Sequence, residues 1–252
     1  MLHAVDVHKN YGDYVAVAGV TLFIDEGEFV SIVGPNGAGK TTLINVLTGL
    51  LQPTAGHVHY KGHDISGAGP VKLAQLGMAR SFQLVAVFAE LTVMEVLQAA
   101  SLTRLGRGMR LFHSLGSDRE VRENAEHIAS LFGLQDQLGV KSGQLPQGNK
   151  KLLDVASAFA LYPEIILLDE PTSGVSTSDK HRIMETLVVA SKEIGIKSII
   201  QVEHDMDIVF GYSDRIVALY EGRVLADGSP QEIECNEEVM RNIIGREPVR
   251  NA

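Results

Sequence analysis

The stretch FVSIVGPNGAGKTT, residues 29–42, combines an apolar strand pattern, a glycine-rich loop and a helix start. The stretch contains the motif G-x-x-x-x-G-K-[ST], whose fixed positions are Gly34, Gly39, Lys40 and Thr41. Glycines in such a loop let successive backbone N–H groups turn inward around an anion, because no Cβ stands in the way. The following helix points the positive end of its dipole at the same place. The stretch therefore predicts a loop that binds polyphosphate.

The side chains of this loop predict ATP and Mg²⁺ as its ligands. Lys40 is expected to reach the β- and γ-phosphates, and Thr41 to ligate Mg²⁺ through its hydroxyl. Thr42 is placed for a contact with the α-phosphate. The residues expected to contact the nucleotide are Gly34, Pro35, Asn36, Gly37, Ala38, Gly39, Lys40, Thr41 and Thr42.

A second apolar run, IILLDE at residues 165–170, supplies the carboxylates that phosphoryl transfer needs. Asp169 ends the predicted strand and is expected to ligate Mg²⁺, while Glu170 is the candidate general base. His57 and His59 share a strand face but lack a nearby carboxylate or thiol partner, so we do not expect them to form a metal site.

The overall composition limits the class of protein. The 252 residues correspond to one or two domains. With 22 Lys and Arg against 31 Asp and Glu, the net charge is −9, which disfavours nucleic acid as a partner. The single cysteine, Cys235, leaves no internal disulfide and favours a reducing compartment. We expect neither a signal peptide nor a membrane-spanning helix.

Alternating strand and helix patterns predict an α/β fold: a P-loop NTPase core with a mostly parallel sheet, an N-terminal antiparallel β layer and an inserted helical subdomain. The clearest core strands are 29–33, 164–168 and 197–202, with helices at 41–50 and 179–194. The β layer is expected from 1–7, 15–24 and 56–60, and a helix at 118–132.

Three parts follow from these patterns. The ATP-binding core and its β layer are expected at residues 1–83 and 161–228, and the helical subdomain at 84–160. A helical tail is expected at 229–252, because Ser229-Pro230-Gln231-Glu232 matches a capping box with proline at the first helical position.

The motifs "GPNGAGKTT" and "IILLDEP", separated by a segment that ends in "LPQGNKKLLDVASAFAL", resemble the nucleotide-binding subunit of an ABC transporter. The resemblance covers essentially the whole chain. It implies that Tyr11 stacks on adenine, that Gln83 in "ARSFQL" acts near the metal and the reaction, and that His204 in "VEHDM" acts near the γ-phosphate. Gly148 corresponds to a glycine of the family signature and is implied to contact nucleotide.

Within that family, "ARSFQLVAVFAELTVMEVL" and "VEHDMDIVFGYSDRIVALYEGRVLADGSPQEI" most resemble the ATPases of branched-chain amino acid importers, with urea and amide importers as close relatives. The resemblance implies a peripheral ATPase at the cytoplasmic face of the inner (plasma) membrane. Its implied partners are permease subunits, a second ATPase subunit and, indirectly, an external solute-binding protein. The apolar stretch 84–97 is expected to contact a permease helix.

The chain departs from the family pattern at the signature and the D-loop. The signature LSGGQ reads Leu145-Pro146-Gln147-Gly148-Asn149, and the D-loop reads Gly174-Val175-Ser176 without the usual Asp. Pro146 suits a first helical turn, so the following helix is expected to form. The missing serine hydroxyl puts the contact with a γ-phosphate across a dimer in doubt.

Three other functions remain open at this stage. A soluble ABC protein acting on DNA or the ribosome would usually carry a basic face or a second cassette. A P-loop kinase needs neither the signature-like helix start nor His204. A regulatory binder that holds ATP without turnover is compatible with the altered signature.

Overall fold

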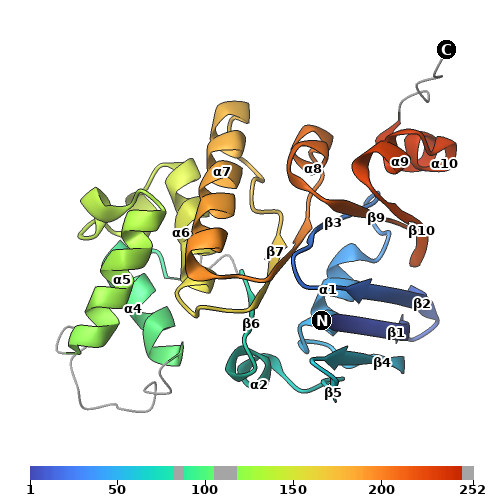
Figure 1. Ribbon diagram of the computed structural model, residues 1–252, viewed down its shortest axis with the longest axis horizontal. Coiled ribbons are helices and arrows are strands. Elements are labelled where there is room, and N and C mark those ends of the chain that lie inside the picture. The colour runs from blue at the N-terminus through green and yellow to red at the C-terminus, as the bar shows by residue number, and fades with distance from the viewer. Residues whose placement is uncertain (82–87, 105–117, 246–252) are drawn as a thin grey trace. The chain divides into compact units, whose positions relative to one another are not determined.

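The computed structural model describes residues 1–81, 88–104 and 118–245 (Figure 1). The chain forms two structural units. Unit 1 comprises Met1–Leu73 and Lys197–Ala252, and unit 2 comprises Ala74–Ile196. The predicted boundaries of the core, the helical subdomain and the tail stay predictions.

Unit 1 contains a four-stranded antiparallel sheet in the order β2-β1-β4-β5 (Figure 1). Its strands are β1 (Leu2–Tyr11), β2 (Tyr14–Ile24), β4 (Ala55–Tyr60) and β5 (His63–Asp64). Leu2 pairs with Ile24 on one side and with Tyr60 on the other, and all three side chains are buried. The predicted β layer is confirmed, although β1 runs on past Val7 through irregularities in its register.

The same unit holds the strands that carry the phosphate loop. They are β3 (Phe29–Val33), β8 (Ser198–Val202), β9 (Arg215–Tyr220) and β10 (Arg223–Gly228), in the order β10-β9-β3-β8. β3 pairs in parallel with β8 and β9, and every residue of β3 is buried. A strand that is buried on both faces is typical of parallel sheets. The predicted strands 29–33 and 197–202 are thereby confirmed.

The helices of unit 1 each bury apolar side chains. They are α1 (Lys40–Leu47), α8 (Met206–Tyr212), α9 (Pro230–Glu234) and α10 (Glu237–Val239), followed by a π-helical turn at Met240–Ile244. Figure 1 shows α9 and α10 beside β9 and β10. Ile233 and Val239 from these helices join Val33, Val209 and Ile216 in one buried cluster. The capping box at Ser229 and Glu232 is confirmed.

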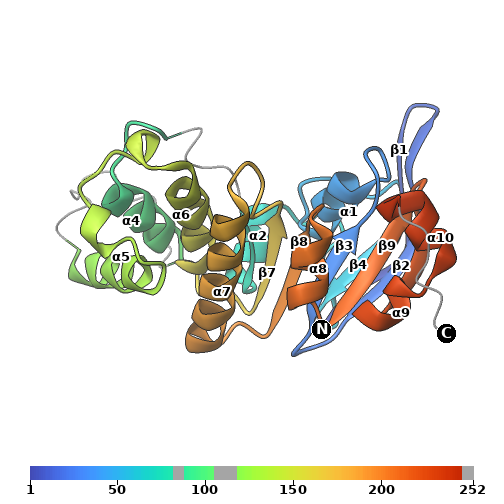
Figure 2. The ribbon, with the colours of Figure 1, turned by 90° about the horizontal axis from the view of Figure 1, so that it is seen from above.

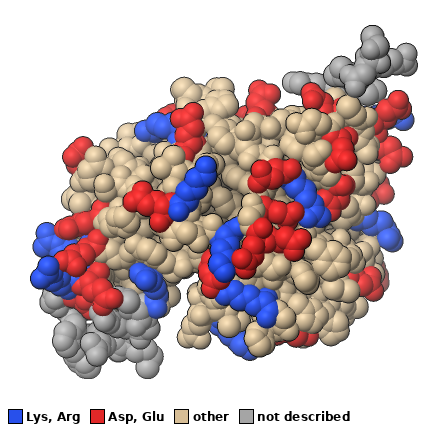
Figure 3. Space-filling model, in the orientation of Figure 1, with Lys and Arg blue, Asp and Glu red and all other residues tan. Residues whose placement is uncertain are grey.

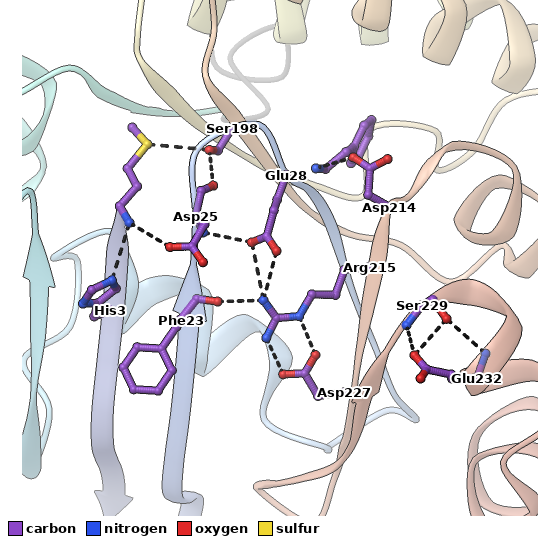
Figure 4. A network of polar contacts seen from close by, with 12 residues as sticks. His3, Phe23, Asp25, Glu28, Ser198, Asp214, Arg215, Asp227, Ser229 and Glu232 are labelled. Carbon is purple, nitrogen blue, oxygen red and sulfur yellow. Dashed lines mark hydrogen bonds and ion pairs between the residues drawn. The ribbon is translucent and has the colours of Figure 1, made fainter.

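A polar network centred on Arg215 ties the strand ends of unit 1 together (Figure 4). Its guanidinium forms a two-point ion pair with Asp227 at 2.6 Å, and donates to the backbone oxygen of Phe23 at 2.9 Å. Glu28 lies 3.3 Å from the same guanidinium. The hydrogen bond with Asp227 raises the pKa of Arg215, so the guanidinium that joins β2, β9 and β10 stays charged at every ordinary pH.

Unit 2 contains two parallel strands and a group of helices. The strands are β6 (Met78–Arg80) and β7 (Ile165–Asp169), and the helices are α4 (Val93–Arg104), α5 (Arg119–Leu131), α6 (Gln147–Phe159) and α7 (Thr177–Ile194), with 3-10 turns at Gln135–Gln137 and Ser142–Gln144. The short helix α2 (Pro70–Gln75) crosses the boundary between the units. Figure 2 shows α4, α5 and α6 packed together. The rings of Phe132 and Phe159 meet edge to face with centroids 5.0 Å apart.

Two details of unit 2 differ from the sequence prediction. Helix α7 begins at Thr177 rather than at Asp179, because the Ser176 hydroxyl caps it by accepting the Asp179 N–H. Its buried stripe uses Met184 and Ala190 beside Ile183 and Leu187, while Val188 and Ile194 are half-buried.

Within the described part of the chain, no helix combines the length and hydropathy that crossing a bilayer would require.

Candidate functional site

The phosphate loop of unit 1 is pressed against neighbouring backbone, which explains two of its glycines. A Cβ at Gly34 would lie 2.3 Å from the backbone oxygen of Leu219 in β9. A Cβ at Gly39 would lie 2.3 Å from the backbone oxygen of Ala16 in β2, and Gly39 also has a left-handed φ of 96° as the N-cap of α1. Only glycine fits at these positions, so the sequence fixes the loop's path on the sheet.

Lys40 is buried within this loop. Its Nζ donates to the backbone oxygens of Gly34, at 2.7 Å, and Pro35, at 2.9 Å. The ammonium is therefore held against the backbone at the start of the loop. Thr41 is exposed and Thr42 is half-buried at the start of the helix. A cation, helix N–H groups and an exposed hydroxyl form the donor set that binds a phosphate chain.

His204 lies in unit 1, at the same edge of the sheet as the phosphate loop. Ile32 of β3 pairs with Val202 of β8 in parallel register, so Gly34 and His204 each follow two residues later on adjacent strands. The His204 side chain is exposed, and the backbone N–H of His204 donates to the buried Glu203 carboxylate at 3.0 Å. The carboxyl edge of parallel strands is where α/β proteins bind ligands.

Tyr11 lies at the tip of the β1–β2 hairpin, where it pairs with Tyr14. Its side chain is 49% exposed, and the Nζ of Lys9 lies 5.5 Å from its ring centroid. The ring is therefore available to stack on a planar group. The proposed contact with adenine stays a prediction.

In unit 2, β7 delivers Asp169 at its carboxyl end after four fully buried apolar residues, Ile165–Leu168. The carboxylate forms an ion pair with Arg80, with 2.8 Å between Nη2 and Oδ2. Arg80 is not among the site residues predicted from the sequence. The only signal was a basic residue at the end of the short strand pattern GMAR.

Glu170, the next residue, has a left-handed backbone with φ 49°, which is strained for a side chain other than glycine. Lys151 of helix α6 supports this turn: its buried Nζ donates to the Glu170 backbone oxygen at 3.1 Å and to the Ser173 hydroxyl at 2.8 Å. Lys151 was also missed. A lysine among the apolar positions of α6 was the available signal.

The altered signature is structured as a helix start. Pro146 is the N-cap of α6 and provides no side-chain hydrogen bond. Gly148 is buried so tightly against α7 that a Cβ there would lie 3.0 Å from Nη2 of Arg182. That guanidinium also donates to Asn149 at 3.3 Å and to Asp179 at 3.1 Å. The predicted helix is present as α6, and Arg182 of α7 contacts its first turn.

One candidate residue cannot be located, and one premise was wrong. Gln83 lies outside the described residues. The statement that no carboxylate lies near His57 is incorrect, because Asp64 Oδ2 lies 3.0 Å from His57 Nδ1. Hydrogen bonds from Ser66, with a smaller contribution from His57, lower the pKa of Asp64 to about 2. Among residues 1–81, 88–104 and 118–245, no group of three or more His, Cys, Asp or Glu side chains could hold a metal ion.

Comparison with known proteins identifies the family. A sequence model described as ABC transporter matches residues 17–173, well over half of the chain. The chain belongs to the ABC transporter family. It is 35% identical, over 97% of its length and 98% of the relative's, to the high-affinity branched-chain amino acid transport ATP-binding protein BraF of Pseudomonas aeruginosa. It is 34% identical, over 93% of its length and 94% of the relative's, to LivG of Escherichia coli K12, which has the same description.

Solved structures of ABC transporter cassettes share the fold. An ATP-binding cassette in its ADP conformation superposes with a TM-score of 0.87 at 29% identity, covering 98% of this chain and 99% of that one. A nucleotide-free cassette gives a TM-score of 0.82 over 97% and 95% of the two chains. The predicted α/β P-loop NTPase fold is confirmed, and the chain is an ABC-type, ATP-binding ATPase.

Proposed function

We propose that this ABC ATPase hydrolyses Mg²⁺-bound ATP to power uptake of branched-chain amino acids through a membrane permease. The observation that carries the ATP part is the phosphate loop, in which the buried Lys40 donates to the backbone of Gly34 and Pro35, and in which Gly34 and Gly39 leave no room for a Cβ. The transport part is supported by whole-length similarity to BraF and LivG, which are described as branched-chain amino acid transport ATP-binding proteins.

Each site residue has a proposed role in this reaction. Lys40 binds the β- and γ-phosphates, Thr42 the α-phosphate, and Tyr11 the adenine. Thr41, Asp169 and Gln83 are proposed ligands of Mg²⁺, which when bound neutralises phosphate charge. Glu170 acts as general base, His204 contacts the γ-phosphate, and Gly148 contacts nucleotide held by a second ATPase subunit.

The chemistry of the donor set fits a magnesium ion. Mg²⁺ prefers oxygen ligands and is usually held by one or two carboxylates together with substrate phosphates. The Asp169 carboxylate already faces a cation in the structure, the guanidinium of Arg80. The exposed Thr41 offers a hydroxyl at the first turn of α1. These are hard oxygen donors, and no thiolate or imidazole is needed.

The proposed location is the cytoplasmic face of the inner membrane, docked to the permease. Acidic side chains are interspersed with basic ones on the face drawn in Figure 3, in keeping with the net charge of −9. Such a surface favours a protein partner over nucleic acid. Phe88, within the stretch proposed to contact the permease, is 45% exposed.

Copurification tests the permease partner. The tagged chain, expressed in its source cells and extracted with mild detergent, should retain a hydrophobic permease. Phe88→Glu should abolish this retention because it places a charge on the proposed contact, while the ATPase activity of the isolated chain stays near wild type. Phe23→Glu is the matched control, since Phe23 is 46% exposed on the antiparallel sheet. Retention of the permease by Phe88→Glu would contradict this contact.

A further inference from the structure

The carboxylate proposed to ligate Mg²⁺ is already paired with a buried arginine. The Arg80 side chain is 9% exposed and the Asp169 side chain 26% exposed. Their 2.8 Å contact joins Nη2 to Oδ2, which is a charge-assisted hydrogen bond. At this burial the pair is shielded from water and salt far more than a surface pair is.

The strand register makes this contact a built feature of unit 2. Arg80 pairs with Leu167 in the parallel ladder, and Asp169 lies two residues further along β7, on the same face. The ladder continues beyond Arg80, because the Ser81 N–H donates to the Leu167 oxygen at 2.9 Å. The Ser81 hydroxyl in turn accepts the Asp169 N–H at 3.4 Å. The backbone pairing of β6 and β7 therefore brings the Arg80 and Asp169 side chains together on one face of the strands.

We infer that Arg80 is a positioning residue that holds the Asp169 carboxylate while no divalent cation is bound, and competes with that cation for the same carboxylate. This inference rests on the proposed function of Asp169 as a metal ligand. A half-buried carboxylate at the end of an apolar strand needs a positive partner. Arg80 supplies one positive charge, whose repulsion a cation arriving at Asp169 must overcome.

The competition has a measurable size and direction. Two cations that share one carboxylate repel each other, so binding of the divalent ion and retention of the Arg80 contact are linked equilibria. Removing the guanidinium charge should therefore tighten cation binding. Coupling between linked sites is typically about 5- to 150-fold in affinity. A role in stability alone would leave the affinity for the cation unchanged.

The test measures Mn²⁺ binding to the full chain by electron paramagnetic resonance, with a non-hydrolysable ATP analogue present. Arg80→Gln removes the charge and keeps a hydrogen-bond donor, so its Mn²⁺ dissociation constant should fall roughly 5- to 150-fold. Arg80→Lys keeps the charge and should stay within a few-fold of wild type. Arg119→Gln is the control for charge alone, because Arg119 pairs with Glu123 on the exposed surface of α5.

Nuclear magnetic resonance of the wild-type chain provides a test that does not depend on a variant folding. Addition of Mg²⁺ with the analogue should shift the guanidinium ¹⁵Nε resonance of Arg80 and leave that of Arg119 in place. An unshifted Arg80 resonance, or an Arg80→Gln chain with wild-type Mn²⁺ affinity, would overturn the inference alone. A wild-type chain that binds no cation with the analogue would overturn the proposed function as well.

Discussion

At the scale of single residues, Gly39 is a position where the backbone leaves no space for a side chain. Its φ of 96° is left-handed, and an added Cβ would lie 2.3 Å from the Ala16 oxygen. Gly37 has a similar φ of 84°, but an added Cβ there meets no atom within 4 Å. A side chain at Gly37 would therefore meet backbone strain alone, whereas a side chain at Gly39 would meet both strain and steric overlap.

Replacing each glycine by alanine should give different losses of stability. Gly37→Ala should cost about 1–2 kcal/mol of unfolding free energy, from the left-handed conformation alone. Gly39→Ala should cost about 1–3 kcal/mol more, because the overlap with β2 adds to the strain. Urea denaturation of the two variants measures both terms. Equal losses would mean that the loop can move away from Ala16 freely.

Glu170 is the residue on which hydrolysis is proposed to depend. Glu170→Gln should retain ATP binding and slow turnover by roughly 10²- to 10⁴-fold, the usual contribution of a general base. Steady-state phosphate release and binding of a fluorescent ATP analogue measure the two properties. Lys40→Ala provides the contrast, since it should weaken binding itself. An unchanged turnover number in Glu170→Gln would remove this residue from the role.

At the scale of elements, local patterns predicted the strands and the capped helices but not the contacts between them. Strand 29–33 is a short apolar run next to a spaced motif, and both signals lie within one segment. The contact of Arg80 with Asp169 joins residues 89 positions apart, and that of Lys151 with Glu170 joins helix α6 to a loop. Periodicity carries no information on such pairings, which depend on strand register and helix placement. Hence β7 could be predicted and its polar partners could not.

The bond from Lys151 links the signature helix α6 to the turn that holds Glu170. Lys151→Met roughly keeps the length of the side chain and removes the donor to the partly buried Glu170 backbone oxygen and Ser173 hydroxyl. We expect a loss of about 1–3 kcal/mol in unfolding free energy. The turnover number should fall by up to about 10²-fold, because the Glu170 backbone loses its anchor. Calorimetry and steady-state ATPase assays measure the two effects.

Lys150→Met is the control for this experiment. It removes the same charge one residue earlier in α6, at a half-buried position. Its stability and turnover should stay close to wild type. If both variants lose activity equally, the effect belongs to the charge of the helix and not to the bond with Glu170.

At the scale of the whole molecule, an acidic ATPase without a membrane-spanning helix among its described residues is proposed to act in a membrane process. The family and the fold are shown over nearly the full length of the chain. Coupling to a permease and the identity of the solute are the proposed steps. They depend on partners, which is why the chain's own geometry specifies the ATPase more closely than the cargo.

The most direct test of the central claim is uptake of radiolabelled leucine into proteoliposomes that contain this chain, its copurified permease and the external solute-binding protein. Leucine should accumulate only with ATP on the side of the ATPase. A complex with Glu170→Gln should assemble and bind ATP but accumulate almost none. Hydrolysis of ATP by the wild-type complex without leucine uptake, or equal uptake with Glu170→Gln, would contradict the account.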